Sequence, residues 1–193
     1  MAIILASQSP RRRELLERMG LEEFEVRPAR GEETAPAGLT PAQLVEELSR
    51  QKAAETARSA GAHDVIIAAD TVVAVDHRVL GKPHSREEAE EMLRLLSGRA
   101  HTVYTGVTVR RGERVLTGHE ATEVMFRALS EQEIRAYVDT GEPMDKAGAY
   151  GIQGRGCVLV EGIRGDYYNV MGLPVCRLAL MLREFGVEPL VRE

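Results

Sequence analysis

The chain has 193 residues and a net charge of −5 at pH 7, and only 4% of its residues are aromatic. Nucleic-acid binders usually carry a basic excess or stack bases on aromatic side chains, so this composition argues against a nucleic-acid partner. No apolar run approaches the ~20 residues that a membrane helix needs. The first residues also lack the basic region of a signal peptide. We therefore expect a cytoplasmic protein without a membrane partner, with Cys157 and Cys176 reduced and in the core.

Helix and strand signals alternate along the chain. Strands are expected over residues 2–6, 24–28, 64–76 and 157–163, and a hairpin over 101–126. Helices are expected over about residues 10–19, 40–59 and 85–96, from residue 130 onward and over 173–185. Capping boxes that start at Thr40, Ser85 and Ser130 predict the beginnings of three of these helices. The segment 64–76 exceeds an ordinary strand, and we expect it to bend near Asp70. Alternating helices and strands with one antiparallel insert predict an α/β fold with a mixed sheet.

The stretch LASQSPRRRELL places three arginines in the first turn of an expected helix, for which Ser9 is the expected N-cap residue. The free N–H groups and the macrodipole make that end of a helix favour negative charge. A solvated helix face explains Arg13, which can pair with Glu17 one turn further on. It explains Arg11 and Arg12 poorly. A phosphate bound by the helix N–H groups, both guanidinium groups and the hydroxyl of Ser7 or Ser9 explains them better.

Further candidates lie at a strand end, in a turn and on a helix. Asp70 and Thr71 lie in AADTVV, where a carboxylate can hold a metal or accept a proton from water, although Asp-Thr is also a common turn cap. Lys82, in LGKP, can aim an ammonium group at a phosphate or belong to an ordinary turn before a proline. Lys52 lies on an expected helix, where most lysines face solvent. None of these segments selects one function by itself.

Two loops supply the remaining candidates. Glu32 and Glu33 belong to the Pro/Gly-rich loop 28–39, and they complete a metal site with Asp70 or merely keep the loop soluble. The run DKAGAYGIQGRG has glycines too irregular for a dinucleotide-binding fingerprint. Such glycines let a backbone approach a ligand closely, where the Gln153 amide can donate and accept hydrogen bonds, or they form a flexible surface loop.

In this order, these segments resemble the Maf family of nucleotide pyrophosphatases. The resemblance rests on LASQSPRRRELL, AADTVVAVD, LGKP, LSGRAHTVYTGV, EPMDKAGAYGIQGRG and YYNVMGLP, which run from residue 5 to about 174. It implies that residues 1–193 form a single Maf-like α/β domain with a mixed, elongated, twisted sheet flanked by helices. It also implies two lobes with a cleft between them, as in the inosine triphosphate pyrophosphatase architecture.

The resemblance also assigns roles by matching position. Asp70 matches the proton-accepting catalytic residue of the family, and AADT with GAYGIQG resembles the branch that acts on dTTP and UTP. The positions that match substrate-selecting residues are Arg11, Thr71 and Gln153. The positions that match phosphate- or metal-contacting residues are Ser7, Arg12, Glu33, Lys52 and Lys82. Glu32 stays open as the alternative to Glu33. A homodimer is a further expectation from the family.

The reaction expected from this resemblance is hydrolysis of dTTP, UTP or a modified pyrimidine nucleotide to the monophosphate and pyrophosphate. Asp70 would orient or deprotonate the water that attacks the α-phosphorus. A divalent cation, Mg²⁺ or Mn²⁺, would be held partly by Asp70 and Glu33 and would offset phosphate charge. The alternative is a nucleotide-sensing protein that regulates cell division without turnover, which needs the basic cradle but no positioned carboxylate.

Overall fold

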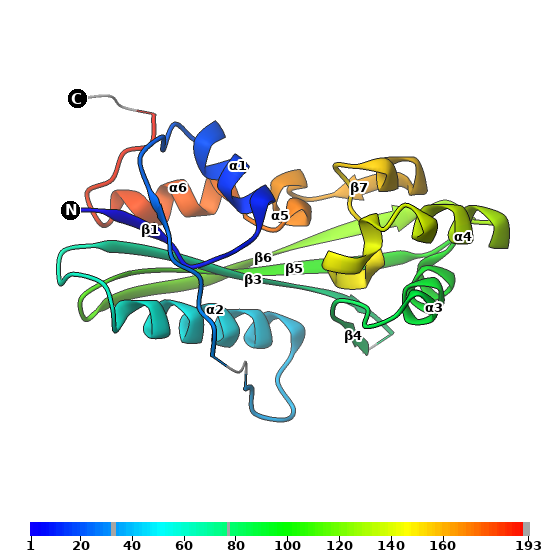
Figure 1. Ribbon diagram of the computed structural model, residues 1–193, viewed down its shortest axis with the longest axis horizontal. Coiled ribbons are helices and arrows are strands. Elements are labelled where there is room, and N and C mark those ends of the chain that lie inside the picture. The colour runs from blue at the N-terminus through cyan, green and yellow to red at the C-terminus, as the bar shows by residue number, and fades with distance from the viewer. Residues whose placement is uncertain (32–33, 77, 191–193) are drawn as a thin grey trace. The chain divides into compact units, whose positions relative to one another are not determined.

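The computed structural model describes residues 1–31, 34–76 and 78–190, and Figure 1 labels its helices and strands. The strands are β1 (Ile3–Leu5), β2 (Glu25–Val26), β3 (Val65–Val75), β4 (Arg78–Leu80), β5 (Ala100–Arg111), β6 (Arg114–Phe126) and β7 (Val160–Arg164). The α-helices are α1 (Pro10–Arg18), α2 (Pro41–Ala57), α3 (Arg86–Leu96), α4 (Glu131–Asp139), α5 (Tyr167–Met171) and α6 (Val175–Arg183). Short 3-10 helices are η1 (Glu142–Asp145), η2 (Ala147–Ala149) and η3 (Arg155–Leu159).

The strands form one seven-stranded mixed sheet in the order β2-β1-β3-β5-β6-β7, with β4 paired to β3. Strands β2 and β3 are parallel to β1, whereas β4 is antiparallel to β3 and β7 is antiparallel to β6. The predicted α/β fold with a mixed sheet flanked by helices is therefore confirmed. Among the described residues, no helix combines the length and the apolar character that crossing a membrane requires.

Contacts within the chain divide it into two compact units. The first unit comprises Met1–Asp70, Thr105–Glu120 and Gly172–Glu193, and the second comprises Thr71–Tyr104 and Ala121–Met171. The long strands β3, β5 and β6 contribute residues to both units. The assignment of residues 1–193 to a single domain stays a prediction.

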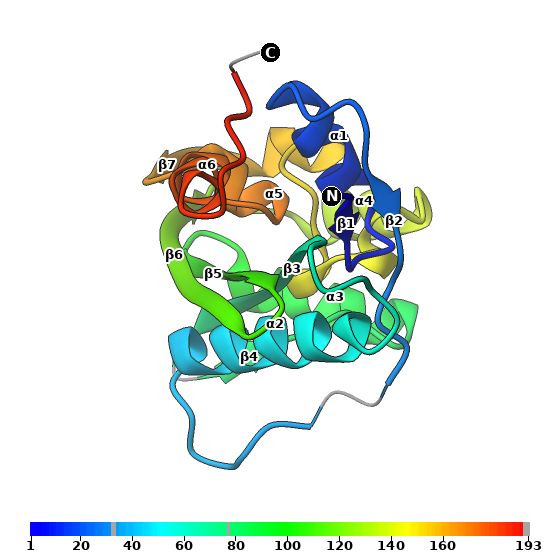
Figure 2. The same cartoon turned by 90° about the vertical axis from the view of Figure 1, so that its left-hand side faces the viewer.

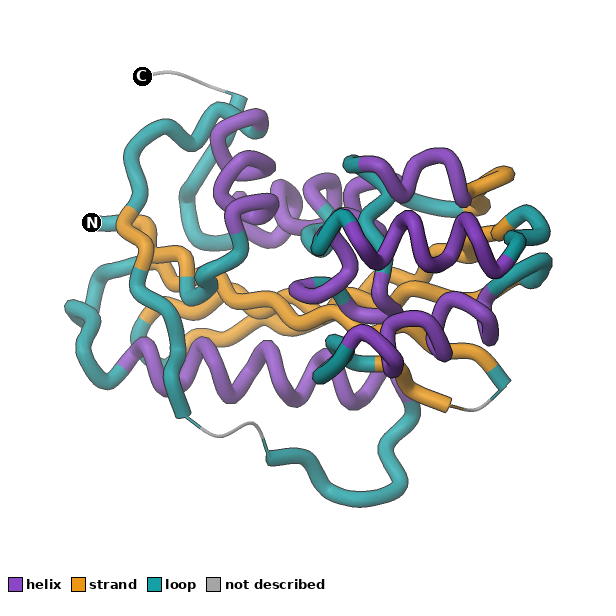
Figure 3. Tube along the Cα trace, turned by 45° about the vertical axis from the view of Figure 1, so that its right-hand side comes forward, coloured by secondary structure: helices purple, strands orange, loops and turns teal. Residues whose placement is uncertain are grey.

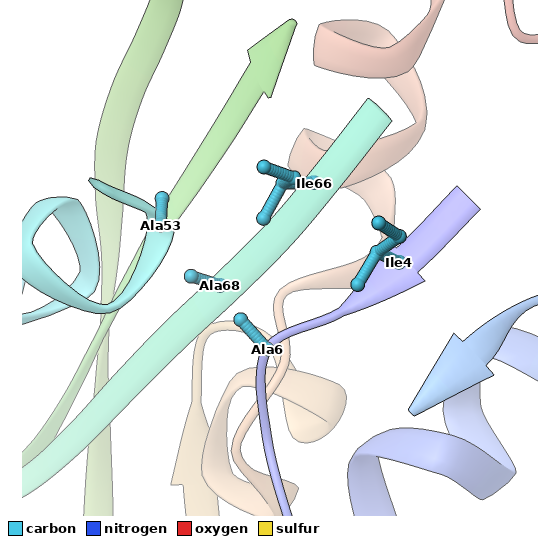
Figure 4. Close-up of a cluster of buried hydrophobic side chains, with 5 residues drawn as sticks. All are labelled: Ile4, Ala6, Ala53, Ile66 and Ala68. Carbon is cyan, nitrogen blue, oxygen red and sulfur yellow. The ribbon is translucent and has the colours of Figure 1, made fainter. Parts of the chain in front are cut away.

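In the first unit, helices cover both faces of the sheet. Figures 1 and 2 show α2 along one face and α1 with α6 on the other. A cluster of buried side chains lies between α2 and the sheet and comes from the β1 segment, β3 and α2 (Figure 4): Ile4, Ala6, Ala53, Ile66 and Ala68. Alternate residues of a strand point to the same face. Asp70 follows Ile66 and Ala68 in that alternation, so its side chain also faces α2.

Helix α2 approaches the sheet closely at Gly106 of β5. A Cβ atom on Gly106 would lie 2.2 Å from the carbonyl oxygen of Val45, so a larger residue would push the helix away. One turn further along α2, the Ser49 hydroxyl lies within 2.8 Å of the Thr108 hydroxyl on the same strand. These two contacts fix the height of α2 above the sheet and, with it, the position of Lys52.

Local capping patterns set the starts of three helices. Thr40 at α2 and Ser130 at α4 form complete capping boxes, as their sequences predicted. At α3 the capping box is incomplete, because only one of its two hydrogen bonds forms. The Ser85 hydroxyl accepts a hydrogen bond from Glu88 N at 3.1 Å, but the Glu88 carboxylate accepts from His84 N, at 2.7 Å, instead of from the cap residue.

The second unit contains a buried aromatic cluster. The rings of His101, Phe126 and Tyr150 meet edge to face, with centroids 5.0, 5.3 and 4.7 Å apart. The His101 Nε2 atom also lies 2.7 Å from the Tyr150 hydroxyl. Figure 3 shows the helices of this unit in purple, and α3 packs against α4 and η2. Burial lowers the pKa of His101 to about 4, so its ring is neutral at pH 7.

Some local expectations were wrong. Residues 157–159 belong to η3 rather than to a strand, because Cys157 N donates to the Gly154 carbonyl oxygen and closes a tight turn, and β7 begins only at Val160. Helix α5 was not predicted. Both cysteines are exposed rather than in the core. Cys157 lies on the outer side of its turn, and Cys176 lies on α6, whose buried residues are Leu178 and Leu182.

The stability of the protein should depend on pH through His101. Its pKa is 6.5 when unperturbed and about 4 in the folded chain, so between these values the unfolded chain binds a proton that the folded chain does not. The free energy of unfolding therefore falls as the pH falls through this window, by at most about 1.4 kcal/mol per pH unit. His101→Gln keeps a polar partner for Tyr150 but does not titrate.

Urea unfolding at several pH values between 7 and 4 measures this effect. The His101→Gln variant should lose less stability than the parent protein over that range. Equal losses in the two proteins would contradict a neutral, buried His101.

Candidate active site

The turn after β1 holds Arg12 in place. Ser7 is 8% exposed, and its Oγ atom accepts hydrogen bonds from Ser9 N at 3.2 Å and from Arg12 Nη1 at 3.1 Å. Arg12 Nε donates to the carbonyl oxygen of Gly172, at 2.7 Å. Ser9 is the N-cap residue of α1, as predicted, but its side chain makes no capping hydrogen bond. The Arg12 guanidinium is therefore fixed beside a helix N-terminus, an environment that favours anions.

The three consecutive arginines of α1 differ in exposure. Arg11 and Arg12 are partly buried, whereas Arg13 is exposed, as its predicted surface role requires. The first turn of the helix contains no acidic residue that would offset the arginines. The ion pair between successive turns of α1 joins Glu14 and Arg18 rather than using Arg13.

Asp70 follows a buried apolar run and is paired in the structure. Residues 65–69 of β3 are at most 2% exposed, and Asp70 follows them at 8%. Its Oδ1 atom lies 2.5 Å from Lys52 Nζ on α2, and the two side chains are 11% and 16% exposed. A carboxylate in such surroundings is costly unless a charge or hydrogen bonds compensate it. The ammonium group supplies that compensation and fixes the orientation of the carboxylate.

The Pro/Gly-rich loop after β2 is tied to the same helix. The Glu55 carboxylate accepts hydrogen bonds from Arg30 N at 2.7 Å and from Gly31 N at 3.0 Å, and these hydrogen bonds lower the pKa of Glu55 below its usual value. Further along, Gln51 Nε2 donates to the Thr34 carbonyl oxygen at 2.6 Å. Both described parts of the loop therefore lie against α2, close to the turn that carries Lys52.

A metal role for the loop carboxylates stays a prediction, because Glu32 and Glu33 lie outside the described residues. Within the part of the chain that the structure describes, no three His, Cys, Asp or Glu side chains form a group that could hold a metal ion. Magnesium is commonly bound by one or two carboxylates together with phosphate oxygens of a substrate. Asp70 supplies one such carboxylate, so the residues present fit a metal of that kind.

In the second unit, the segment LGKP lies beside the glycine-rich loop. Gly148 N donates to the carbonyl oxygen of Gly81, at 3.0 Å, directly before the exposed Lys82. Gly148 has a φ of 69°, and a Cβ atom there would lie 2.7 Å from Val73 of β3. The loop therefore packs on the strand that begins this unit with Thr71, a partly buried residue.

The predicted site residues fall into two sets. The described residues of the first unit are Ser7, Arg11, Arg12, Lys52 and Asp70, and those of the second are Thr71, Lys82 and Gln153. Within the first set, hydrogen bonds join Ser7 to Arg12 and Lys52 to Asp70. Gln153 is exposed on the glycine-rich loop.

Two residues outside the sequence-based prediction hold that loop. Tyr137 of α4 and Glu142 of η1 accept hydrogen bonds from backbone N–H groups of residues 151, 155 and 156. Glu142 lies in EPMDKAGAYGIQGRG, one of the segments that carry the family resemblance. No sequence pattern, however, predicts that a carboxylate at position 142 accepts hydrogen bonds from the N–H groups of residues 155 and 156.

Two solved structures share the fold of this chain. The HAM1 protein of Coxiella burnetii aligns with a TM-score of 0.55 at 16% identity, over 95% of this chain and 99% of that protein. The Ham1 protein of Staphylococcus aureus aligns with a TM-score of 0.51 at 15% identity, over 97% of this chain and its entire length. At these identities the likeness defines the fold class alone, that of the Ham1-like α/β proteins.

Sequence comparison identifies the family. Residues 2–185 match the model of the Maf-like proteins. The dTTP/UTP pyrophosphatase of Pelotomaculum thermopropionicum is 53% identical over 186 residues, which cover 95% of this chain and 96% of that protein. The dTTP/UTP pyrophosphatase of Bacillus anthracis is 49% identical, over 96% of each chain. The chain belongs to the Maf family, as its motifs predicted.

The energy of the Lys52–Asp70 pair can be measured with a double-mutant cycle. Lys52→Met leaves a largely buried carboxylate without its cation, and Asp70→Asn leaves the ammonium without its anion, so each should destabilise the protein. The double variant should lose less stability than the sum of the two, by about 1–3 kcal/mol, because both charges are then gone.

Urea unfolding of the four proteins gives the coupling energy. The surface pair Arg183–Glu188, whose side chains are 56% and 46% exposed, is the matched control and should show a much smaller coupling. Additive losses at Lys52 and Asp70 would contradict a stabilising buried pair.

Proposed function

We propose that this chain hydrolyses dTTP and UTP to the nucleoside monophosphate and pyrophosphate, and that it accepts pyrimidine nucleotides modified on the base. The observation that carries the proposal is the Lys52–Asp70 pair, which holds a carboxylate in a fixed orientation where β3 leaves its apolar run. Two relatives that share about half of their residues with this chain are named dTTP/UTP pyrophosphatases, which supports the choice of reaction.

In the proposed reaction, Asp70 acts as a general base. A water oxygen attacks the α-phosphorus and gives a proton to the Asp70 carboxylate. The bond between the α-phosphorus and the oxygen that bridges it to the β-phosphorus breaks, and pyrophosphate leaves. Lys52 orients the carboxylate throughout, a role that adds to the phosphate binding expected from the sequence.

The phosphate groups of the substrate meet cations from several segments. Arg12 is already oriented by Ser7 and Gly172, so binding a phosphate costs little further side-chain entropy. Arg11 and Lys82 are assigned to substrate and phosphate binding by their matching positions in the family motifs. A divalent cation, Mg²⁺ or Mn²⁺, held by Asp70 and Glu33, would offset phosphate charge and make water more acidic.

Base selection is assigned to Thr71, Gln153 and Arg11. The glutamine amide offers one acceptor and two donor hydrogens, which suit the alternating carbonyl and N–H groups of uracil and thymine. Polar recognition discriminates strongly, because a wrong base leaves buried groups without hydrogen bonds. The homodimer and the cytoplasmic location stay predictions from the sequence.

Asp70→Asn tests the chemical role. The variant keeps the shape of the side chain but removes the base, so the rate of pyrophosphate release from dTTP should fall by about 10²–10⁴-fold. Nucleotide binding, measured by calorimetry, should persist. Asp139→Asn, at an exposed carboxylate of α4, is the matched control and should react at the parental rate. An Asp70→Asn variant with the parental rate would refute the assignment.

A nucleotide panel tests the choice of substrate. With Mn²⁺ present, pyrophosphate release should be faster from dTTP and UTP than from CTP, GTP or 7-methyl-GTP. Faster turnover of either guanine nucleotide would contradict the pyrimidine assignment. Binding of dTTP without any pyrophosphate release would support the nucleotide-sensing division regulator instead.

A further inference from the structure

The glycines of the loop 151–156 make room for side chains of the chain itself. A Cβ atom on Gly154 would lie 2.4 Å from Glu142 Oε2, and one on Gly156 would lie 2.7 Å from the Tyr137 hydroxyl. Neither distance is possible for an ordinary side chain. From the sequence, these glycines were expected to let the backbone approach a ligand or to form a flexible surface loop. In the structure they let the backbone approach a carboxylate and a phenol.

The Glu142 carboxylate binds the second half of the loop. Its Oε2 atom accepts a hydrogen bond from Arg155 N at 2.8 Å, and its Oε1 atom accepts from Gly156 N at 3.0 Å. Oε1 also accepts from the Tyr137 hydroxyl, at 2.8 Å. Both carboxylate oxygens are therefore engaged by neighbouring groups, two of them successive backbone amides.

Tyr137 binds the first half of the loop. Its hydroxyl accepts a hydrogen bond from Gly151 N, at 3.0 Å, while it donates to Glu142. Gly151 lies two residues before Gln153, and Arg155 lies two residues after it. The backbone is thus held on both sides of Gln153, whereas the Gln153 residue is exposed.

We call this arrangement the Glu142 clamp; it consists of Tyr137 and Glu142 with the N–H groups of residues 151, 155 and 156. Further hydrogen bonds hold Tyr137 and Glu142 in place. The Thr140 hydroxyl donates to the Tyr137 carbonyl oxygen at 2.6 Å and accepts from Glu142 N at 3.2 Å. Lys146 Nζ donates to the Glu142 carbonyl oxygen at 2.8 Å. Tyr137 is only 6% exposed. The clamp therefore extends from helix α4, which carries Tyr137, and from the 3-10 helix η1 after it, which carries Glu142.

The charges of the clamp suit its hydrogen bonds. Burial raises the pKa of Glu142, but the hydrogen bonds from Arg155 N, Tyr137 and Gly156 N outweigh burial and leave the pKa below its usual value. Burial raises the pKa of Tyr137 beyond its usual range. At pH 7 the carboxylate is ionised and the phenol is neutral, so the backbone amides meet a charged acceptor, which binds more strongly than a neutral one.

We propose that Glu142 is a positioning residue for substrate selection, which acts by fixing the loop so that Gln153 presents its amide to the pyrimidine. The proposal rests on the proposed function, because Gln153 must read the base. Residues 150–154 form no helix or strand, so their backbone groups need partners outside a regular element. Glu142 and Tyr137 supply partners at the two points that flank the exposed glutamine.

Glu142→Gln tests this role, because the amide keeps the size of the side chain but places an N–H group where an amide donor now binds. Preference for dTTP over CTP, measured as the ratio of kcat/KM values, should fall by about tenfold or more, since small misplacements of a contacting group have effects of this size. The change should lie mainly in the KM for dTTP. Hydrogen exchange of the amides at Gly151, Arg155 and Gly156 should become faster.

Two further variants separate positioning from a general loss of stability. Tyr137→Phe removes only the hydrogen bonds of the hydroxyl and should shift the preference in the same direction, but less. Glu133→Gln alters a carboxylate of the same unit that bonds Ser130 and Arg127 rather than the loop. This control should leave the preference for dTTP unchanged.

The comparison with Gln153→Ala decides whether Glu142 acts through Gln153. We expect Gln153→Ala to lower the preference for dTTP, and the added Glu142→Gln change to lower it no further. A Gln153→Ala effect together with parental selectivity in both Glu142→Gln and Tyr137→Phe would overturn the clamp and leave the proposed function standing. A parent protein that releases no pyrophosphate from dTTP would overturn both.

Discussion

The ion pair between Lys52 and Asp70 is the interaction on which the candidate site depends. It brings two opposite charges into a layer with many buried apolar side chains, so helix α2 must lie close enough to β3 for the ammonium to reach the carboxylate. Small residues make this possible. Ala53 and Ala68 allow close packing between α2 and β3, and Gly106 lets the helix backbone lie directly on β5. The same close packing of α2 on the sheet therefore forms the core of the first unit and places Lys52 against Asp70.

The second unit also contains a carboxylate whose charge must be compensated, that of Glu142. Glu142 is ionised and partly withdrawn from water, and backbone amides of the glycine-rich loop compensate its charge. In both units neighbouring groups of the chain hold a carboxylate in place: an ammonium group holds Asp70, and backbone N–H groups hold Glu142. Asp70 is the carboxylate proposed to act as the general base, whereas Glu142 binds the loop whose Gln153 is proposed to contact the pyrimidine base.

Sequence alone was sufficient where the signal is local. The apolar runs of β1 and β3 predict buried strands, and the capping boxes at Thr40 and Ser130 predict the starts of α2 and α4, because each depends on residues within one turn. The separation of Arg13 from its two neighbours also followed from local electrostatics. The family motifs supplied Asp70 as the catalytic candidate, and the structure shows why an aspartate is tolerated there.

Contacts between distant segments could not be predicted from the sequence. Nothing in the helical sequence around Lys52 indicates that its ammonium binds Asp70, because that contact depends on how closely α2 packs. One partner of the Arg12 guanidinium is the carbonyl oxygen of Gly172, 160 residues further along the chain. The glycine spacing predicted a close approach to a ligand or a flexible loop, whereas the group that Gly154 approaches in the structure is the Glu142 carboxylate. The exposure of Cys176 depends on the side of α6 that the core covers.

The central claim is that water attacks the α-phosphorus of a pyrimidine nucleoside triphosphate. The most direct measurement is hydrolysis of dTTP in water labelled with heavy oxygen, followed by mass spectrometry of both products. We expect one heavy oxygen atom in thymidine monophosphate and none in pyrophosphate. Label in pyrophosphate, or thymidine diphosphate as the product, would contradict it.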